Sequence, residues 1–200
     1  GHQHMAVEGV ELSGTYAVQP PANAGHFLRI TGQQDGRNFC FHSKLTPVGA
    51  THGTEPYQSL LPLEQAVQVW LDQPIGELAY PISPEGKLDA ALYGSQVAAL
   101  FNQVQLSETG ADFSCTSLGN DPVGLASPVT MRGVTAAYLF ANTLVVLEVT
   151  EEVLRQTLER CAAYFTLVDG QPQISEEFLL PKVEHYNYDF YAGLSYTFDL

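Results

Sequence analysis

Two histidines at the start of the chain have the spacing of metal ligands. The sequence opens Gly1-His2-Gln3-His4, so the two imidazoles stand at positions i and i+2. On a tight turn, such a pair can reach two neighbouring metal ions, and glycine lets the backbone approach closely. A tag or cloning scar has a similar sequence, because His-Met junctions are common in expressed proteins. These four residues alone leave both interpretations open.

A second candidate site is an aromatic ring followed two residues later by a side-chain amide. Phe140 and Asn142 fall in a predicted loop just before a β-branched run. The ring could stack on a planar base and the amide could hydrogen-bond to the edge of that base. A packed phenylalanine and a turn asparagine fit the same residues, and the pattern alone favours this simpler interpretation.

The third candidate is the aromatic run Tyr186-Asn187-Tyr188-Asp189-Phe190-Tyr191, which ends before Gly193. It fits either a recognition loop or a packed corner. The sequence contains no glycine-rich phosphate loop, no Gly-x-Ser-x-Gly motif and no cysteine pair with zinc spacing. Its three cysteines, Cys40, Cys115 and Cys161, are best interpreted as isolated thiols.

Charge and composition exclude several protein classes. The 200 residues carry a formal net charge of −14, which disfavours coating of a nucleic acid polymer. Apolar residues make up 45% and charged residues 15%, which excludes a disordered acidic tail. No apolar run approaches the roughly 18–20 residues that cross a bilayer. Acids and bases balance over residues 1–50, so the whole excess of negative charge lies after residue 50 and indicates a boundary there.

Periodicity predicts a β segment first and mixed helices and strands after it. Residues 49–58 are turn-rich and form the predicted linker. Thr130 is expected to cap a short helix through Tyr138, and Thr150 a longer helix with Glu151 and Glu152 in its first turn. The remaining elements are predicted as strands at 14–19, 26–31, 38–45, 110–116, 143–149 (buried) and 194–200, a turn at 32–36, and helices at 63–72 and 94–104.

Taken together, these segments resemble the bacterial 5′-nucleotidase superfamily, in particular its 2′,3′-cyclic-nucleotide 2′-phosphodiesterase/3′-nucleotidase branch. The resemblance covers nearly the whole chain. Its first part consists of Gly1–His4, which resembles the last metal motif of the calcineurin-like metallophosphatase domain, together with 14–19 and 25–28. Its second part consists of Ala111-Asp112, Leu118-Gly119-Asn120, 129–134, 138–144, Leu158-Glu159, 162–165, 185–189 and 193–196. Because 14–19 and 25–28, which resemble the family's strands after this motif, both follow it, His2 and His4 are interpreted as native.

The resemblance implies an α+β fold. Residues 1–48 would be the C-terminal end of a metallophosphatase domain, 49–58 a linker, and 59–200 an incomplete 5′-nucleotidase C-terminal domain of mixed α/β structure. It also implies an exported protein, periplasmic or at the cell surface. The remaining metal ligands are expected before Gly1 and a second stacking aromatic after Leu200, so the rest of the parent chain would be the partner of this one.

The implied chemistry is hydrolysis by a pair of divalent metal ions, such as manganese or zinc. By resemblance, His2 and His4 would each bind one ion, Phe140 would stack on the base, and Asn142 would contact it. Asn120 would be a further polar residue facing the nucleotide or nucleoside. Two ligands cannot hold two ions, so we expect no bound metal pair and no hydrolysis by this chain alone. The alternatives are a non-catalytic nucleotide-binding or surface-interaction module, and an unrelated α+β domain with Phe140 in its core.

Overall fold

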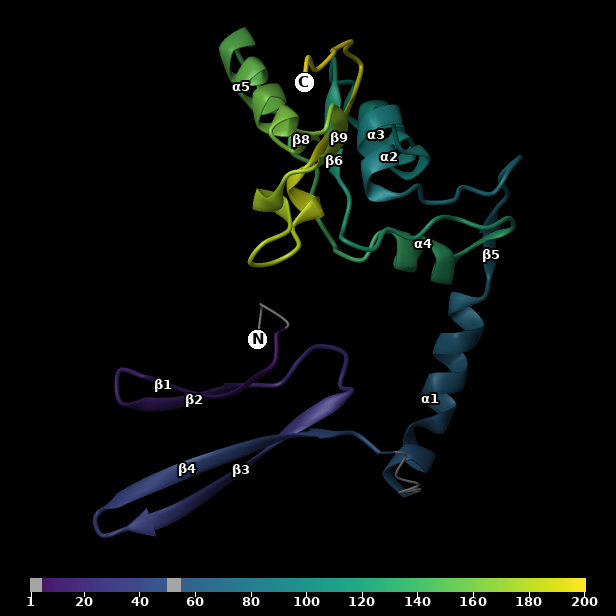
Figure 1. The fold of residues 1–200 in the computed structure, drawn as a ribbon. Helices are drawn as coiled ribbons and strands as arrows, with labels where there is room; N and C mark the ends of the chain where they lie inside the picture. The colour runs from purple at the N-terminus through teal and green to yellow at the C-terminus, as the bar shows by residue number, and fades with distance from the viewer. Residues whose placement is uncertain (1–4, 50–54) are drawn as a thin grey trace. The chain divides into compact units, whose positions relative to one another are not determined.

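The computed structural model describes residues 5–49 and 55–200, and it divides into two compact units, Gly1–Leu61 and Pro62–Leu200 (Figure 1). His2 and His4 lie outside the described residues, as does part of the predicted linker. Helix α1 (Glu55–Leu71) begins within the predicted linker and spans the junction between the units. Among the described residues, no helix combines the length and apolar character that crossing a bilayer requires.

The first unit consists of two antiparallel hairpins. Strands β1 (Val7–Leu12) and β2 (Thr15–Gln19) meet at Ser13 and Gly14, whose φ angles of 49° and 78° suit a two-residue hairpin turn. Strands β3 (His26–Asp35) and β4 (Asn38–Pro47) pair along their full length. The Tyr16 hydroxyl lies 2.9 Å from the Ser43 hydroxyl and so links the two hairpins. The predicted β segment is therefore confirmed, although β3 continues through the turn predicted at 32–36.

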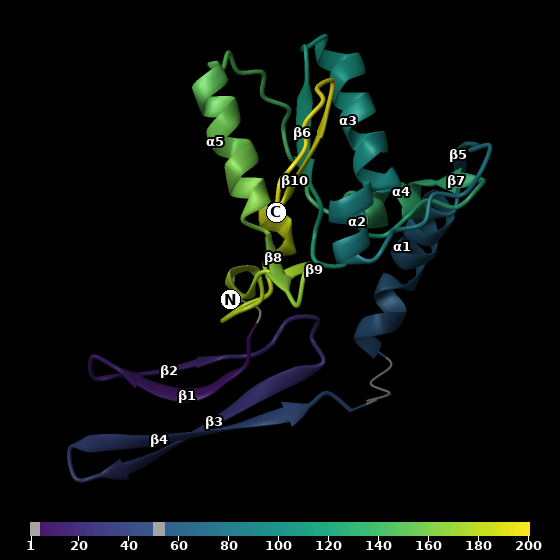
Figure 2. The same ribbon diagram turned by 45° about the horizontal axis from the view of Figure 1, so that its top comes forward.

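The second unit is built around one antiparallel strand pair between two helices. Strand β6 (Ser114–Ser117) pairs with β10 (Asp189–Ala192), and α3 (Gln96–Thr109) packs against both strands. Figure 2 shows the pair between α3 and α5 (Glu151–Ala162). The other elements of this unit are α2 (Lys87–Tyr93), α4 (Met131–Ala137), the hairpin β8 (Phe165–Val168) with β9 (Gln171–Ile174), the pair β5 (Pro74–Gly76) with β7 (Val129–Thr130), and the 3₁₀ turns Glu176–Phe178 and His185–Asn187.

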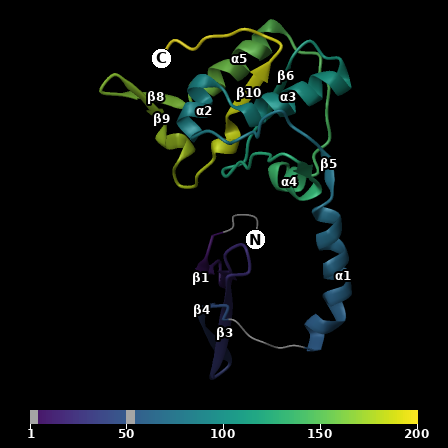
Figure 3. The same ribbon diagram turned by 90° about the vertical axis from the view of Figure 1, so that its right-hand side faces the viewer.

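Side-chain caps mark where α4 and α5 begin. The hydroxyls of Thr130 and Thr150 accept hydrogen bonds from the backbone N–H groups of Gly133 and Val153, at the starts of α4 and α5. Both caps confirm the sequence prediction. Figure 3 shows α1 leading into β5, with α4 nearby. Arg132 donates to the Asp72 carboxylate at 2.7 Å and to Gln68, which ties α4 to the end of α1.

The core of the second unit is mainly aromatic. Tyr164, Phe165, Phe178 and Tyr188 pack together with Cys161, and Val97, Ala98 and Leu118 form a second cluster on the α3 side. Phe190 packs against both clusters and so connects them. Cys161 near the end of α5 and Phe165 at the start of β8 are both buried in this core.

The buried strand predicted at 143–149 is wrong. These residues form no strand, and the side chains of Val145 and Leu147 are 71% and 73% exposed. The segment lines a cavity of about 460 Å³ together with residues Ala111–Cys115, without pairing to β6. A β-branched run fits a pleated surface, but it becomes a strand only where a neighbouring backbone pairs with it.

The strand predicted at 194–200 is also wrong. The strand in this region is β10, which lies earlier, inside the aromatic run, and ends before Gly193 with its φ of 87°. The alternation after Gly193 reflects ring packing instead. Phe198 packs against the aromatic cluster, and its ring centroid lies 5.2 Å from that of Tyr196.

We predict that the buried amide of Asn102 is essential for the stability of the second unit. The side chain is 1% exposed; it donates to the Phe190 carbonyl at 2.8 Å and accepts from the Ser114 hydroxyl at 2.8 Å. Asn102→Ala should lower the free energy of unfolding by about 1–3 kcal/mol, because the Phe190 carbonyl loses this donor and the Ser114 hydroxyl keeps only the Asn102 backbone carbonyl as acceptor. Urea titration measures this. The control is Gln103→Ala, at an exposed position of the same helix, and equal effects of the two substitutions would contradict the prediction.

Candidate functional site

Phe140 and Asn142 line one cavity in the second unit. The cavity has a volume of about 140 Å³, and its wall also includes Gly119, Asp121 and Tyr186. The backbone N–H of Asn142 donates to the Phe140 carbonyl at 2.8 Å, a tight turn that fixes the spacing of the two residues. The Phe140 side chain is 69% exposed. The alternative of a core phenylalanine is therefore wrong, and the ring is free to receive a planar ligand.

The pairing of β6 with β10 brings two distant segments to this cavity. Ser117, the last residue of β6, pairs with Asp189, the first residue of β10. The strands are antiparallel, so the loop after β6 and the segment before β10 lie at the same end of the ladder. Gly119 and Asp121 come from the first segment and Tyr186 from the second. Residues almost 70 positions apart in the sequence therefore form one wall.

Asn120 connects these two segments instead of lining the cavity with its neighbours. Its side-chain amide donates to the Val183 carbonyl at 2.8 Å, and its side-chain oxygen accepts from the His185 backbone N–H at 3.0 Å. A residue of α2 also stabilises the loop after β6, since the Lys87 ammonium donates a hydrogen bond to the Gly119 carbonyl at 2.9 Å. The structure thus brings Phe140 and Asn142 together and places Asn120 in a supporting position.

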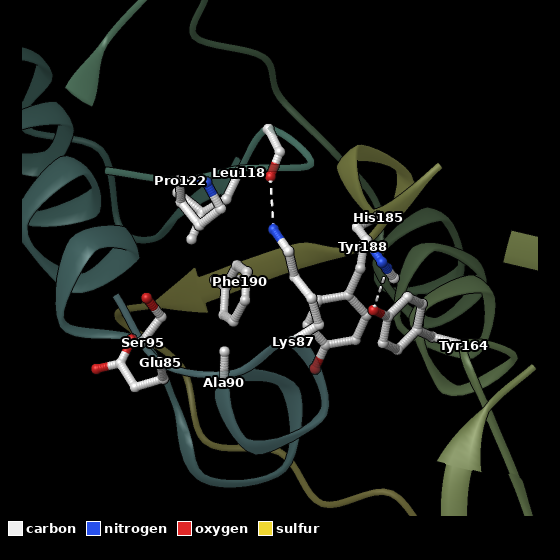
Figure 4. A pocket seen from close by; sticks show the side chains of 11 residues that line it. Glu85, Lys87, Ala90, Ser95, Leu118, Pro122, Tyr164, His185, Tyr188 and Phe190 are labelled. Atoms are coloured by element: carbon white, nitrogen blue, oxygen red, sulfur yellow. Dashed lines mark hydrogen bonds between the residues drawn. The ribbon is translucent and has the colours of Figure 1, made fainter. Parts of the chain in front are cut away.

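A smaller cavity shares Leu118, Gly119 and Pro122 of this loop in its lining (Figure 4). Its volume of about 20 Å³ has room for about one water molecule. Lys87, Tyr164 and His185 contribute to its lining, and the Tyr164 hydroxyl lies 2.7 Å from Nδ1 of His185. Burial lowers the pKa of His185, and the nearby Lys87 charge lowers it further. The lowered pKa favours the neutral imidazole, in which Nδ1 either accepts from the tyrosine hydroxyl or donates to it, depending on the tautomer.

Comparison with known proteins identifies the family of this part of the chain. The family model for the C-terminal domain of 5′-nucleotidase matches residues 76–200, the part of the chain that contains the whole cavity. The chain belongs to the 5′-nucleotidase family. This confirms the resemblance and the α+β fold expected from the sequence.

Two relatives extend the comparison beyond that domain. The chain is 26% identical to a 2′,3′-cyclic-nucleotide 2′-phosphodiesterase/3′-nucleotidase from Haemophilus influenzae, over 70% of this chain and 24% of that protein. It also resembles a crystal structure from Staphylococcus aureus, described as a 5′-nucleotidase in complex with alpha-ketoglutarate, with a TM-score of 0.81 and 29% identity. That match covers 95% of this chain and 38% of the other. The chain thus spans well under half of either relative.

No local sequence signal identifies the supporting residues of the site. Tyr186 stands in the aromatic run 186–191, but its place at the cavity of Phe140 depends on the β6–β10 pairing. Lys87 is one of few basic residues in an acidic region and has no motif around it. The predicted ligands His2 and His4 lie outside the described residues, so their role stays a prediction.

We predict that the second unit loses stability at alkaline pH through its buried tyrosines. Burial raises the pKa of Tyr164 to about 12, from about 10 for an unperturbed tyrosine. The folded protein then holds a proton that the unfolded chain has lost. This stabilisation is complete below pH 10 and disappears as the pH rises toward 12. Melting temperatures of the wild type measured at a series of pH values should fall across this interval.

The Tyr164→Phe variant should show a smaller alkaline decrease in melting temperature than the wild type, because the buried group that titrates has been removed. Tyr80→Phe is the matched control, since the Tyr80 side chain is 83% exposed, and it should keep the full decrease. An identical decrease in the wild type and Tyr164→Phe would show that Tyr164 is not responsible.

Proposed function

We propose that this chain recognises the base of a nucleoside or nucleotide, as the specificity part of a phosphoesterase. The substrates proposed for the whole protein are nucleoside 2′,3′-cyclic phosphates and 3′- or 5′-nucleotides. The observation that carries the proposal is the exposed Phe140 ring and the Asn142 side chain in the wall of one cavity. The ring offers a face for stacking, and the amide offers both a donor and an acceptor for the base edge.

The charge of the cavity supports recognition of the base and not of the phosphate. Its lining is apolar or polar and neutral apart from Asp121. A phosphate group would be repelled by this carboxylate and by the net charge of −14, whereas an uncharged base would not. The positively charged groups that bind the phosphate must therefore lie elsewhere in the intact protein.

We propose a divalent metal pair as that positive partner, with His2 and His4 contributing one ligand to each ion. When bound, such a pair neutralises phosphate oxygens and activates a water molecule. Residues 5–49 and 55–200 contain no group of three or more His, Cys, Asp or Glu side chains that could hold a metal ion. In this proposal, the rest of the parent protein supplies the remaining metal ligands.

We predict that Phe140→Ala weakens adenosine binding by about 5-fold to 150-fold, because base–aromatic stacking contributes about 1–3 kcal/mol. Asn142→Ala should weaken it by about 5-fold, the effect of one hydrogen bond of about 1 kcal/mol. Titration followed by NMR chemical shifts measures both effects. Tyr93→Ala, an 83% exposed aromatic outside the cavity, is the control. Unchanged binding in Phe140→Ala would overturn the base-stacking proposal.

We also predict that this chain alone does not hydrolyse nucleotides. Two histidines provide too few ligands for a two-metal centre. Incubation with a 2′,3′-cyclic nucleotide and excess Mn²⁺ should release no phosphate monoester above the protein-free control. Hydrolysis at a rate near that of an intact family enzyme, measured in parallel, would contradict the assignment of the metal ligands.

A non-catalytic nucleotide-binding module is the second candidate function. The same cavity supports it, since binding through Phe140 and Asn142 requires no metal. The sequence of the parent gene distinguishes the phosphoesterase from the binding module. An Asp-x-His motif and an Asn-His-Glu-like motif before Gly1 would support the enzyme, and a parent without them would support the binding module.

A further inference from the structure

The Tyr-Asn-Tyr-Asp run has no role in the function proposed above, yet its two tyrosines have different environments. Tyr188 is 3% exposed and donates from its hydroxyl to the Ala91 carbonyl at 3.1 Å, so it belongs to the core. Tyr186 is half-buried and lines the same cavity as Phe140 and Asn142. One tyrosine of the run thus stabilises the fold while the other reaches the candidate site.

The Tyr186 side chain is held in place by charged neighbours. Its hydroxyl donates to the Glu184 carboxylate at 3.0 Å and lies 3.2 Å from the Lys182 ammonium, which donates to it. The same ammonium lies 5.3 Å from the centroid of the ring. A ring fixed in this way loses little conformational freedom when a ligand binds, which favours its use as a contact surface.

Asn120 fixes the backbone immediately before Tyr186. Its two hydrogen bonds reach Val183 and His185, on either side of Glu184, so one side chain holds both ends of this short segment. Asn120 itself sits in a loop anchored by β6 and by the Lys87 contact at Gly119. The position of Tyr186 at the cavity therefore depends on Asn120.

We propose that Tyr186 is an additional aromatic contact for the nucleoside bound at Phe140, distinct from the stacking aromatic expected after Leu200, and that Asn120 is the residue that positions it. This proposal rests on the proposed function. It assigns the Tyr186 ring to contact the base or ribose from the side of the cavity formed by the segment before β10. It also gives Asn120 an indirect role, through the backbone of residues 183–185, in place of contact with the substrate.

The test of Tyr186 is adenosine titration of this chain, followed by NMR. Tyr186→Ala should weaken binding about 5-fold or more, as expected for the loss of an aromatic contact. Tyr186→Phe keeps the ring and should bind within about 2-fold of the wild type, because its hydroxyl only anchors the ring. Amide chemical-shift dispersion and melting temperature show whether each variant is folded, and Tyr93→Ala is the exposed aromatic control.

Failure of this inference can be distinguished from failure of the proposed function. Weaker binding in Phe140→Ala with unchanged binding in Tyr186→Ala would overturn the role of Tyr186 and leave the base site intact. Unchanged binding in both variants would overturn the base site itself.

The positioning role of Asn120 is tested by a double-mutant cycle. If Asn120 acts through Tyr186, Asn120→Ala should weaken adenosine binding in the wild type but cause no further loss in Tyr186→Ala. Additive losses would instead indicate that Asn120 contacts the ligand directly or acts by another route, and would overturn the inference. Asn120→Asp, which keeps the acceptor for the His185 N–H and loses the donor, provides the same comparison if Asn120→Ala does not fold.

Discussion

The pairing of β6 with β10 is the interaction on which the candidate site depends. Asn102 secures this pair from α3, since its buried amide bonds to the Phe190 carbonyl on one strand and to the Ser114 hydroxyl on the other. Because Ser117 pairs with Asp189, the loop containing Asn120 and the segment containing Tyr186 leave the ladder together. This register is what brings the two segments together to form one wall of the cavity. The aromatic cluster around Tyr164 and Tyr188 packs beside the same strands and keeps them in place.

The sequence predicted those features that local interactions determine. Thr130 and Thr150 were identified as caps because a hydroxyl satisfies the free N–H groups of a helix within three residues. The hairpin of β3 and β4 was found because a Gly-containing turn separates two alternating segments. The β-branched run at 143–149 predicts a strand in the same way, from its local pattern. That prediction is wrong because a strand also needs a pairing partner, which the local pattern does not reveal.

The candidate site was predicted in part. Phe140 and Asn142 were found through their two-residue spacing and through resemblance, and the structure places both at one cavity. Asn120 was expected to face the substrate, but its amide bonds to the backbone at Val183 and His185. Neither that contact nor the place of Tyr186 could be inferred, since both depend on contacts across more than 60 residues. His2 and His4 remain predictions.

In the proposed complex, a nucleoside base lies against Phe140, with Tyr186 in the wall of the same cavity. Intermolecular nuclear Overhauser effects between adenosine and the protein, recorded at saturating ligand, test this arrangement. We expect contacts from the base protons to the Phe140 ring and contacts from the nucleoside to the Tyr186 ring. Contacts confined to other surfaces, or the absence of any contact to Phe140 in a sample that binds adenosine, would contradict it.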